Sequence, residues 1–272
     1  MKKYLVSSAT LPLALKKAFY EYQYLPEALK MLPVDGMELV FLPEWDHYPL
    51  KTPTSADLSR VEKISLEKLI DFIEVHNLKV YSVHINRDVG CYLCGNSEEV
   101  KIGKEILARN LEAACRLNAE IAVFHLWDTY KEDLNIGNIF AEIASLISRY
   151  PLKIAYENVP ISAKNLTQFE AWKNLSEIMP ANHGFTLDLN WCSLYDNYHE
   201  LKAFKNKIYN VHVQGLIENN SFVPRVGKLK ILECLEDFYK SGYNGLITLE
   251  LNRVRGIEDF LLALELIKKH SQ

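Results

Sequence analysis

The segment Leu152-Lys153-Ile154-Ala155-Tyr156-Glu157 is short, apolar and rich in strand-forming residues, and it ends on a carboxylate. Three later segments repeat this design and end on a residue that can bind a metal: Gly184-Phe185-Thr186-Leu187-Asp188, Ile208-Tyr209-Asn210-Val211-His212 and Leu246-Ile247-Thr248-Leu249-Glu250. An unpaired carboxylate is costly to bury, so its repeated placement after a buried strand requires a compensating charge. One divalent metal ion bound by all four side chains would supply that charge.

Short strand-like runs alternate with longer helical patterns along the whole chain. The runs that we interpret as strands are Lys3–Ser8, Met37–Leu42, Lys79–Ile85, Ile121–His125, Lys153–Glu157, Gly184–Asp188, Tyr209–Val213 and Leu246–Glu250. They read as continuous apolar segments, which is typical of parallel strands that are covered on both faces.

The stretches between these runs carry apolar residues at helical spacing. One such face consists of Leu66, Leu69, Ile70, Phe72 and Ile73, and comparable faces lie in residues 106–115, 140–147 and 260–267. Eight strands that are each followed by a helix, without a Pro/Gly/Ser-rich linker, predict an α/β protein with a single (β/α)₈ TIM-barrel domain over residues 1–272. The alternative is an open doubly wound sheet, which usually has a Gly-rich phosphate loop after its first strand. Ser7-Ser8-Ala9-Thr10 is no such loop.

Composition and charge narrow the class of protein. The chain has 272 residues, of which 49% are hydrophobic and 24% charged, as is typical of a globular protein of enzyme size. The formal net charge of −4 does not suggest general attraction to nucleic acid or to acidic lipid. The amino terminus lacks the apolar core of a signal peptide, and no apolar run reaches the roughly 18 residues that cross a bilayer. We therefore expect a cytoplasmic protein without a membrane segment.

The cysteines do not indicate a disulfide framework, because there are five of them, an odd number. Cys91-Tyr92-Leu93-Cys94 has the spacing of half a zinc ribbon, but no second such pair occurs. Two free thiols in a loop are the preferred interpretation.

The chemistry of a (β/α)₈ barrel lies at the carboxyl-terminal ends of its strands. Glu157, Asp188, His212 and Glu250 are therefore predicted to converge on one mouth from the last four strands. Three carboxylates and one imidazole form an oxygen-rich set that favours manganese, magnesium or cobalt, while zinc also fits.

The sequence resembles the xylose isomerase-like TIM barrels, which include sugar (phosphate) isomerases and epimerases and, more distantly, abasic-site nucleases of the endonuclease IV type. The resemblance is most specific at Tyr156-Glu157-Asn158, Thr186-Leu187-Asp188, Val211-His212 and Leu249-Glu250. It implies that Glu157, Asp188, His212 and Glu250 are metal ligands, as the matching residues are in the family. It further implies that Glu157 and Glu250 act as acid and base, as the matching glutamates do in the ketose epimerases.

That implication agrees with the chemistry of the residues. A divalent metal at the carbonyl and hydroxyl oxygens of a ketose acidifies the neighbouring C–H bond, and two flanking carboxylates can remove and return a proton through an enediolate. Return of the proton to the same carbon gives an epimerase, and its return to the adjacent carbon gives an isomerase. Dehydration of a polyol ketone begins with the same step.

Two histidines end earlier strands, His84 in Tyr81-Ser82-Val83-His84 and His125 in Val123-Phe124-His125. The nuclease branch uses matching histidines with the first glutamate for a second metal. A second metal on His84, His125 and Glu157 is therefore an alternative. The preferred interpretation is that both histidines contact substrate or stay neutral in the barrel mouth.

Three departures from the family pattern argue against a nuclease. Trp191 stands where relatives have a histidine, and His212-Val213-Gln214-Gly215 lacks the usual Lys-Asp. Residues 219–225 lack the Asp and His that complete a three-metal site. We expect Trp191 and Gln214 to line the substrate pocket instead.

Weaker candidates for substrate contact are Glu44, Trp127 and Arg253, because an aromatic wall or a cation at the rim suits a sugar. His47–Arg60 and Asn86–Ser97 are predicted to be loops over the mouth. The favoured function is a metal-dependent isomerase or epimerase of a small sugar. The alternatives are an abasic-site endonuclease, a polyol-ketone dehydratase and a non-catalytic sugar-binding barrel. A ring of exposed helices makes a homodimer plausible.

Overall fold

The computed structural model describes residues 2–43, 48–51, 64–127 and 131–271. These residues form two compact units, of which one combines the amino-terminal segment to Leu39 with the chain from Leu187 onward. The other unit contains the described residues between them, from Val40 to Thr186.

The unit built from both chain ends contains four parallel strands, β1 (Lys3–Ser7), β2 (Gly36–Val40), β7 (Ile208–Glu218) and β9 (Leu246–Leu251). They lie in the order β2-β1-β9-β7, with Leu5 opposite Gly36, Tyr4 opposite Ile247, and His212 opposite Thr248. Its helical elements are η1 (Leu11–Leu15), η2 (Tyr22–Tyr24), α1 (Leu25–Lys30), α7 (Leu189–Tyr195), α8 (Tyr198–Leu201), η4 (Lys202–Lys207), α9 (Ile231–Lys240) and α10 (Ile257–Lys269).

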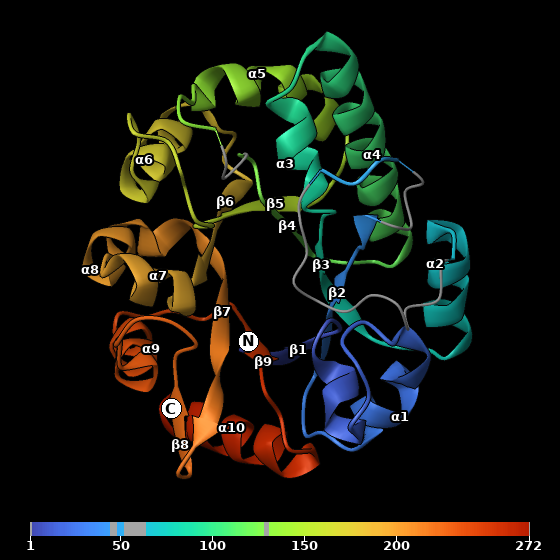
Figure 1. Ribbon diagram of the computed structural model, residues 1–272, viewed down its shortest axis with the longest axis vertical. Coiled ribbons are helices and arrows are strands. Elements are labelled where there is room, and N and C mark those ends of the chain that lie inside the picture. Colours follow the sequence, from blue (N-terminus) through green and yellow to red (C-terminus); the bar gives the residue numbers. More distant parts are fainter. Residues whose placement is uncertain (1, 44–47, 52–63, 128–130, 272) are drawn as a thin grey trace. The chain divides into compact units, whose positions relative to one another are not determined.

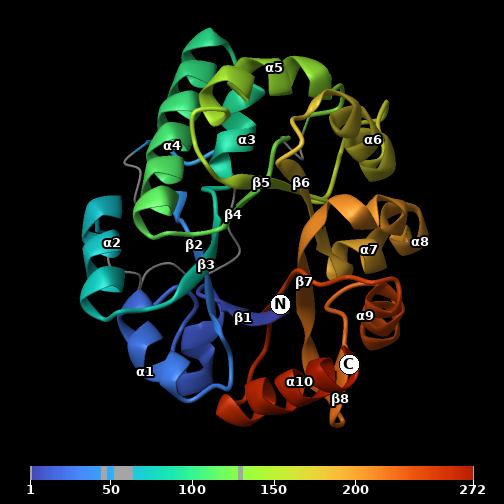
Figure 2. The same ribbon diagram turned by 180° about the vertical axis from the view of Figure 1, so that it is seen from behind.

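The other unit also has parallel strands, β3 (Val80–His84), β4 (Ile121–Phe124), β5 (Lys153–Glu157) and most of β6 (His183–Asp188), paired in that order. Its helices are α2 (Leu66–Val75), α3 (Asp88–Leu93), α4 (Ser97–Arg116), α5 (Ile136–Ile147) and α6 (Gln168–Ile178). Figure 1 shows α3, α4, α5 and α6 on one side of these strands, and Figure 2 shows the same arrangement from behind.

Local sequence explains where these helices begin. Asn96 and Glu99 form a reciprocal capping box at the start of α4, and Thr167 and Glu170 form another at the start of α6. At the start of α2, the side-chain oxygen of Ser65 accepts a hydrogen bond from the backbone N–H of Lys68, which is a simple N-cap. Helix α2 then buries Leu66, Leu69, Ile70 and Ile73 of the apolar face that its spacing predicts, while Phe72 is half-buried.

The strands were interpreted as continuous apolar segments, but some of them carry buried polar side chains. Successive side chains on a strand point to opposite faces. On β7 the polar residues Asn210 and His212 share one face with Thr248 on β9, and all three are buried. One face therefore packs against helices, and the other carries a buried polar network.

Two segments for which no strand or helix was predicted contain regular structure. Asn86–Ser97 includes helix α3. Residues 219–225 contain β8 (Ser221–Val223), which pairs antiparallel with the end of β7. Asn219 and Asn220 form the turn with φ of 48° and 59°. Positive φ at both turn residues matches the twist of a two-residue hairpin.

The predicted loop His47–Arg60 lies largely outside the described residues. Among the helices that the structure describes, none combines the length and the apolar character needed to cross a membrane.

Candidate metal centre

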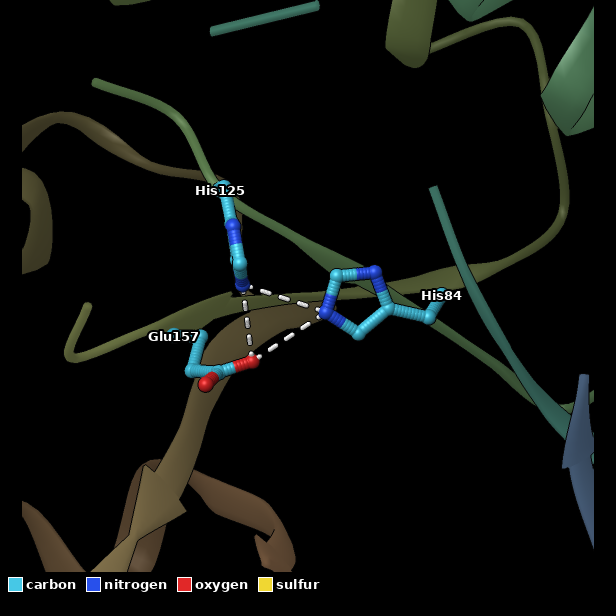
Figure 3. Close-up of side chains that lie close together, drawn as sticks. All are labelled: His84, His125 and Glu157. Carbon is cyan, nitrogen blue, oxygen red and sulfur yellow. Dashed lines mark hydrogen bonds and ion pairs between the residues drawn. The ribbon is translucent and has the colours of Figure 1, made fainter. Parts of the chain in front are cut away.

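Three predicted site residues meet at the ends of neighbouring strands in the unit from Val40 to Thr186. His84 ends β3, His125 follows β4 directly, and Glu157 ends β5. The two Nε2 atoms lie 3.1 Å apart, and Oε2 of Glu157 lies 3.2 Å from that of His125 and 3.3 Å from that of His84. Figure 3 shows the three groups pointing at one another. Their ligand atoms are close enough to share one cation.

The protonation of this cluster suits a cation. Nδ1 of His84 lies 2.9 Å from the carbonyl oxygen of Ile85, which can only accept, so Nδ1 carries a proton and a neutral His84 has its lone pair on Nε2. Burial lowers the pKa of His125, although the charge of Glu157 opposes that shift. Neutral imidazoles are the form that binds metals.

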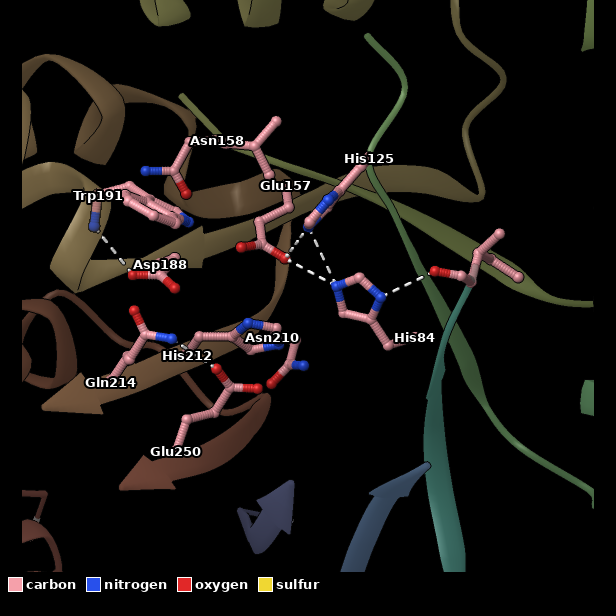
Figure 4. Close-up of polar contacts among 12 residues, drawn as sticks. His84, His125, Glu157, Asn158, Asp188, Trp191, Asn210, His212, Gln214 and Glu250 are labelled. Carbon is pink, nitrogen blue, oxygen red and sulfur yellow. Dashed lines mark hydrogen bonds and ion pairs between the residues drawn. The ribbon is translucent and has the colours of Figure 1, made fainter. Parts of the chain in front are cut away.

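A second cluster lies in the unit built from both chain ends. Glu38 on β2, His212 on β7 and Glu250 on β9 also offer ligand atoms close enough to share a cation. Nε2 of His212 lies 3.1 Å from Oε1 of Glu38. Gln214 donates from Nε2 to Oε2 of Glu250 at 3.0 Å. Figure 4 shows His212, Gln214 and Glu250 among their polar neighbours.

Asp188 ends β6 and caps helix α7 at the same time. Its Oδ1 accepts from the backbone N–H of Asn190 at 2.6 Å and of Trp191 at 3.0 Å. The carboxylate is 1% exposed. Because two amides hold one oxygen, the orientation of the carboxylate is fixed by the start of the helix.

The structure therefore groups the predicted ligands within each unit. It brings His212 together with Glu250, and Glu157 together with His84 and His125. The convergence of Glu157, Asp188, His212 and Glu250 on one ion stays a prediction. Sequence reasoning missed Glu38, although a charged residue inside the apolar run Met37–Leu42 was the available signal.

The other predicted pocket residues have varied surroundings. Trp191 is half-buried on α7, with the guanidinium of Arg225 5.6 Å from the centre of its indole ring. Trp127 is buried, and its indole N–H has no hydrogen-bond partner within the part of the chain that is described. Arg253 is exposed and has a left-handed backbone with φ of 53°. Glu44 lies outside the described residues.

Comparisons with known proteins identify the fold. A family model described as "Xylose isomerase-like TIM barrel" matches residues 26–270. A D-allulose 3-epimerase from Methylomonas sp. in complex with D-allulose has a similar structure, with a TM-score of 0.70 at 15% identity over 98% of this chain and 96% of that chain. An L-ribulose 3-epimerase has a TM-score of 0.70 at 14% identity over 100% of this chain and 95% of that chain. The predicted (β/α)₈ TIM-barrel fold is thus confirmed.

Two further comparisons add detail. A D-tagatose 3-epimerase-like protein has a TM-score of 0.65 at 19% identity over 98% of this chain and 96% of that chain. An uncharacterized protein of Methanocaldococcus jannaschii is 25% identical over 195 residues. That match spans 64% of this chain and 64% of the relative's length.

Proposed function

Because this chain belongs to the xylose isomerase-like TIM-barrel family, we propose that it is a metal-dependent epimerase or isomerase of a small sugar or a related hydroxy-carbonyl compound. The single observation that carries the proposal is the grouping of carboxylates with imidazoles in two clusters whose ligand atoms can share a cation. Solved structures of similar fold include epimerases named for D-allulose, L-ribulose and a 3-keto-D-glucoside. These names support a ketose as the substrate class.

Glu157, Asp188, His212 and Glu250 are the proposed metal ligands. Three carboxylates and one imidazole suit manganese, magnesium or cobalt, and zinc fits the same set. The donors fit a cation because Glu157, Asp188 and His212 are each at most 3% exposed, and buried carboxylates need a positive partner. When bound, the ion would polarise the oxygens of the substrate and acidify the C–H bond beside its carbonyl.

Glu157 and Glu250 are the proposed acid and base. One carboxylate removes the proton next to the carbonyl, and the other delivers a proton to the opposite face of that carbon. Gln214 supports this role because its amide holds Oε2 of Glu250 at 3.0 Å. Delivery to the same carbon is epimerisation, the reaction for which the structural neighbours are named.

His84 and His125 are the proposed substrate contacts beside Glu157, since their imidazoles lie within 3.3 Å of its carboxylate. The competing role is a second metal site, because the ligand atoms of the same three residues could also share a cation. Elemental analysis separates the two roles. If the protein binds one metal per chain and His84→Gln keeps it, the histidines contact substrate. If the protein binds two metals and His84→Gln loses one of them, the histidines form a second metal site.

The decisive experiment measures exchange of solvent deuterium by NMR. We expect metal-loaded protein to incorporate deuterium next to the carbonyl of a ketose from a panel that includes D-allulose, D-tagatose and L-ribulose. Glu157→Gln and Glu250→Gln should each lower the rate about 100- to 10,000-fold, the usual contribution of general acid–base catalysis. Glu27→Gln, at an exposed position on α1, is the matched control.

Exchange that persists in both variants would contradict the proposal, as would exchange that a chelator leaves unchanged. Cleavage of an abasic DNA duplex would instead favour the nuclease alternative.

A further inference from the structure

Glu38 is a buried carboxylate that the proposed reaction does not use. It is the third residue of strand β2, and it is 0% exposed. Its oxygens lie 3.1 and 3.3 Å from Nε2 of His212, and Nδ2 of Asn210 donates to Oε2 at 2.8 Å. These contacts offset the cost of burying the carboxylate, which would be too high without them.

The contact spans the sheet of this unit. The strand order is β2-β1-β9-β7, so the side chains of Glu38 and His212 reach each other across β1 and β9. Thr248 on β9 donates from Oγ1 to Oδ1 of Asn210 at 3.1 Å. Since that oxygen accepts from Thr248, the amide of Asn210 is turned with its N–H₂ group toward Glu38. Thr248, Asn210 and Glu38 thus form one chain of hydrogen bonds that ends at the imidazole.

This chain determines which nitrogen of His212 carries a proton. An ionised carboxylate can only accept, so the Nε2 atom facing Glu38 must be the donor. A neutral imidazole that is protonated on Nε2 has its lone pair on Nδ1. We propose that Glu38 is a positioning residue that holds His212 as the Nε2–H tautomer, so that His212 binds metal through Nδ1. The inference rests on the proposed metal-dependent function.

Glu38 is assigned this role rather than that of a ligand because of its existing bonds. Both of its oxygens lie against Nε2 of His212, and one also accepts from Asn210. It also lies in the middle of its strand, whereas Glu157 and Asp188 stand at the ends of theirs. Carboxylates that orient a metal-binding histidine typically change metal affinity by about 10- to 100-fold.

The test has a readout that needs no metal. Nitrogen-15 NMR of metal-free protein at pH 8 reports which ring nitrogen of His212 is protonated, with His212→Gln used to assign the signal. We expect the Nε2–H tautomer in the unaltered protein. In Glu38→Gln the new amide N–H₂ can donate to Nε2, so the Nδ1–H tautomer should become populated. Manganese should then bind about 10- to 100-fold more weakly by calorimetry.

Glu27→Gln is the control for removing one negative charge, and it should change neither readout. Thermal unfolding of each variant checks that the fold is kept. An Nδ1–H tautomer in the unaltered protein would overturn the inference. So would a Glu38→Gln variant that keeps both the tautomer and an affinity within twofold, or one that loses manganese as completely as Glu250→Gln without any change of tautomer. The unaltered protein could bind no metal while the tautomer of His212 still depends on Glu38. The proposed metal-dependent function would then be wrong, but the role of Glu38 in setting the tautomer would hold.

Discussion

Gln214 and Gly215 stand where the resembled family usually has Lys-Asp. Gln214 connects Glu250 to the rest of its unit. It donates to Glu250 at 3.0 Å and accepts from Nδ2 of Asn190 at 2.8 Å. Asn190 in turn accepts from the backbone N–H groups of Arg225 and Val226. Glu250, the proposed acid or base, is therefore held by the neutral amide of Gln214. That amide is hydrogen-bonded through both its nitrogen and its oxygen.

We predict that Gln214→Ala lowers the rate of deuterium exchange about 10- to 100-fold, because a hydrogen bond to a charged group contributes about 1.5–3 kcal/mol. The matched control is Gln23→Ala, at an exposed position in η2, which should leave the rate unchanged. Equal rates in the two variants would mean that Gln214 does not orient Glu250.

His183 makes stability depend on pH. Burial lowers its pKa to about 4. Its Nδ1 lies 3.0 Å from the hydroxyl oxygen of Tyr156, and burial raises the pKa of that hydroxyl well above its usual value. The unfolded chain takes up this proton near pH 6.5 and the folded chain only near pH 4. The free energy of unfolding should therefore fall as pH decreases through this window, by up to about 3 kcal/mol from this residue.

Urea unfolding at several pH values between 4 and 7 checks this prediction. The variant His183→Asn removes the titrating group, so its stability should fall less steeply over the same window. Identical slopes for the two proteins would show that His183 does not contribute.

The backbone of helix α3 packs closely against the backbone of the segment that carries His125. A Cβ atom built on Gly90 would lie 2.4 Å from the carbonyl oxygen of His125 and 3.1 Å from that of Trp127. Only glycine permits this approach, so α3 helps to set the position at which the chain leaves β4. The predicted loop over the mouth is, in this part, a packed structural element.

We predict that Gly90→Ala destabilises the protein by about 1–3 kcal/mol, as overpacking usually does, and weakens metal binding because His125 is displaced. Gly137→Ala on α5 is the matched control, since its new Cβ would meet only Asn135 at 3.4 Å. A glycine replaced by alanine in a helix should raise stability by about 0.5–1 kcal/mol. Urea unfolding measures both, and equal stability of the two variants would refute the packing role of Gly90.

At the scale of the molecule, one compact unit is assembled from both ends of the chain. Lys2 donates from Nζ to the carbonyl oxygen of Ser271, and the hydroxyl of Tyr4 lies 2.7 Å from that of Ser271. This unit cannot form until the chain between its two segments has been made. We propose that the chain is a single domain in which neither unit is stable alone.

The expected outcome is a single unfolding transition, with the same midpoint by circular dichroism and by fluorescence. Two separated transitions would instead make each unit an independent domain. A homodimer also stays a prediction, which light scattering coupled to gel filtration checks.

The sequence by itself determined the class of fold and the placement of the strands. All eight predicted runs are strands, and β5 has the predicted bounds, because apolar runs and helical periodicity are local properties that short windows preserve. The same locality placed Glu157, Asp188 and Glu250 at or beside strand ends. His212 was also predicted to end its strand, but β7 continues to Glu218, so His212 lies within it.

Only the tertiary structure decided which polar groups meet. Glu38 is separated from Asn210 by 172 positions and from His212 by 174, and their contact depends on the order of four strands. The pairing of His84 with His125 joins residues 41 positions apart. No local pattern encodes such contacts, because they arise from packing that the whole chain determines.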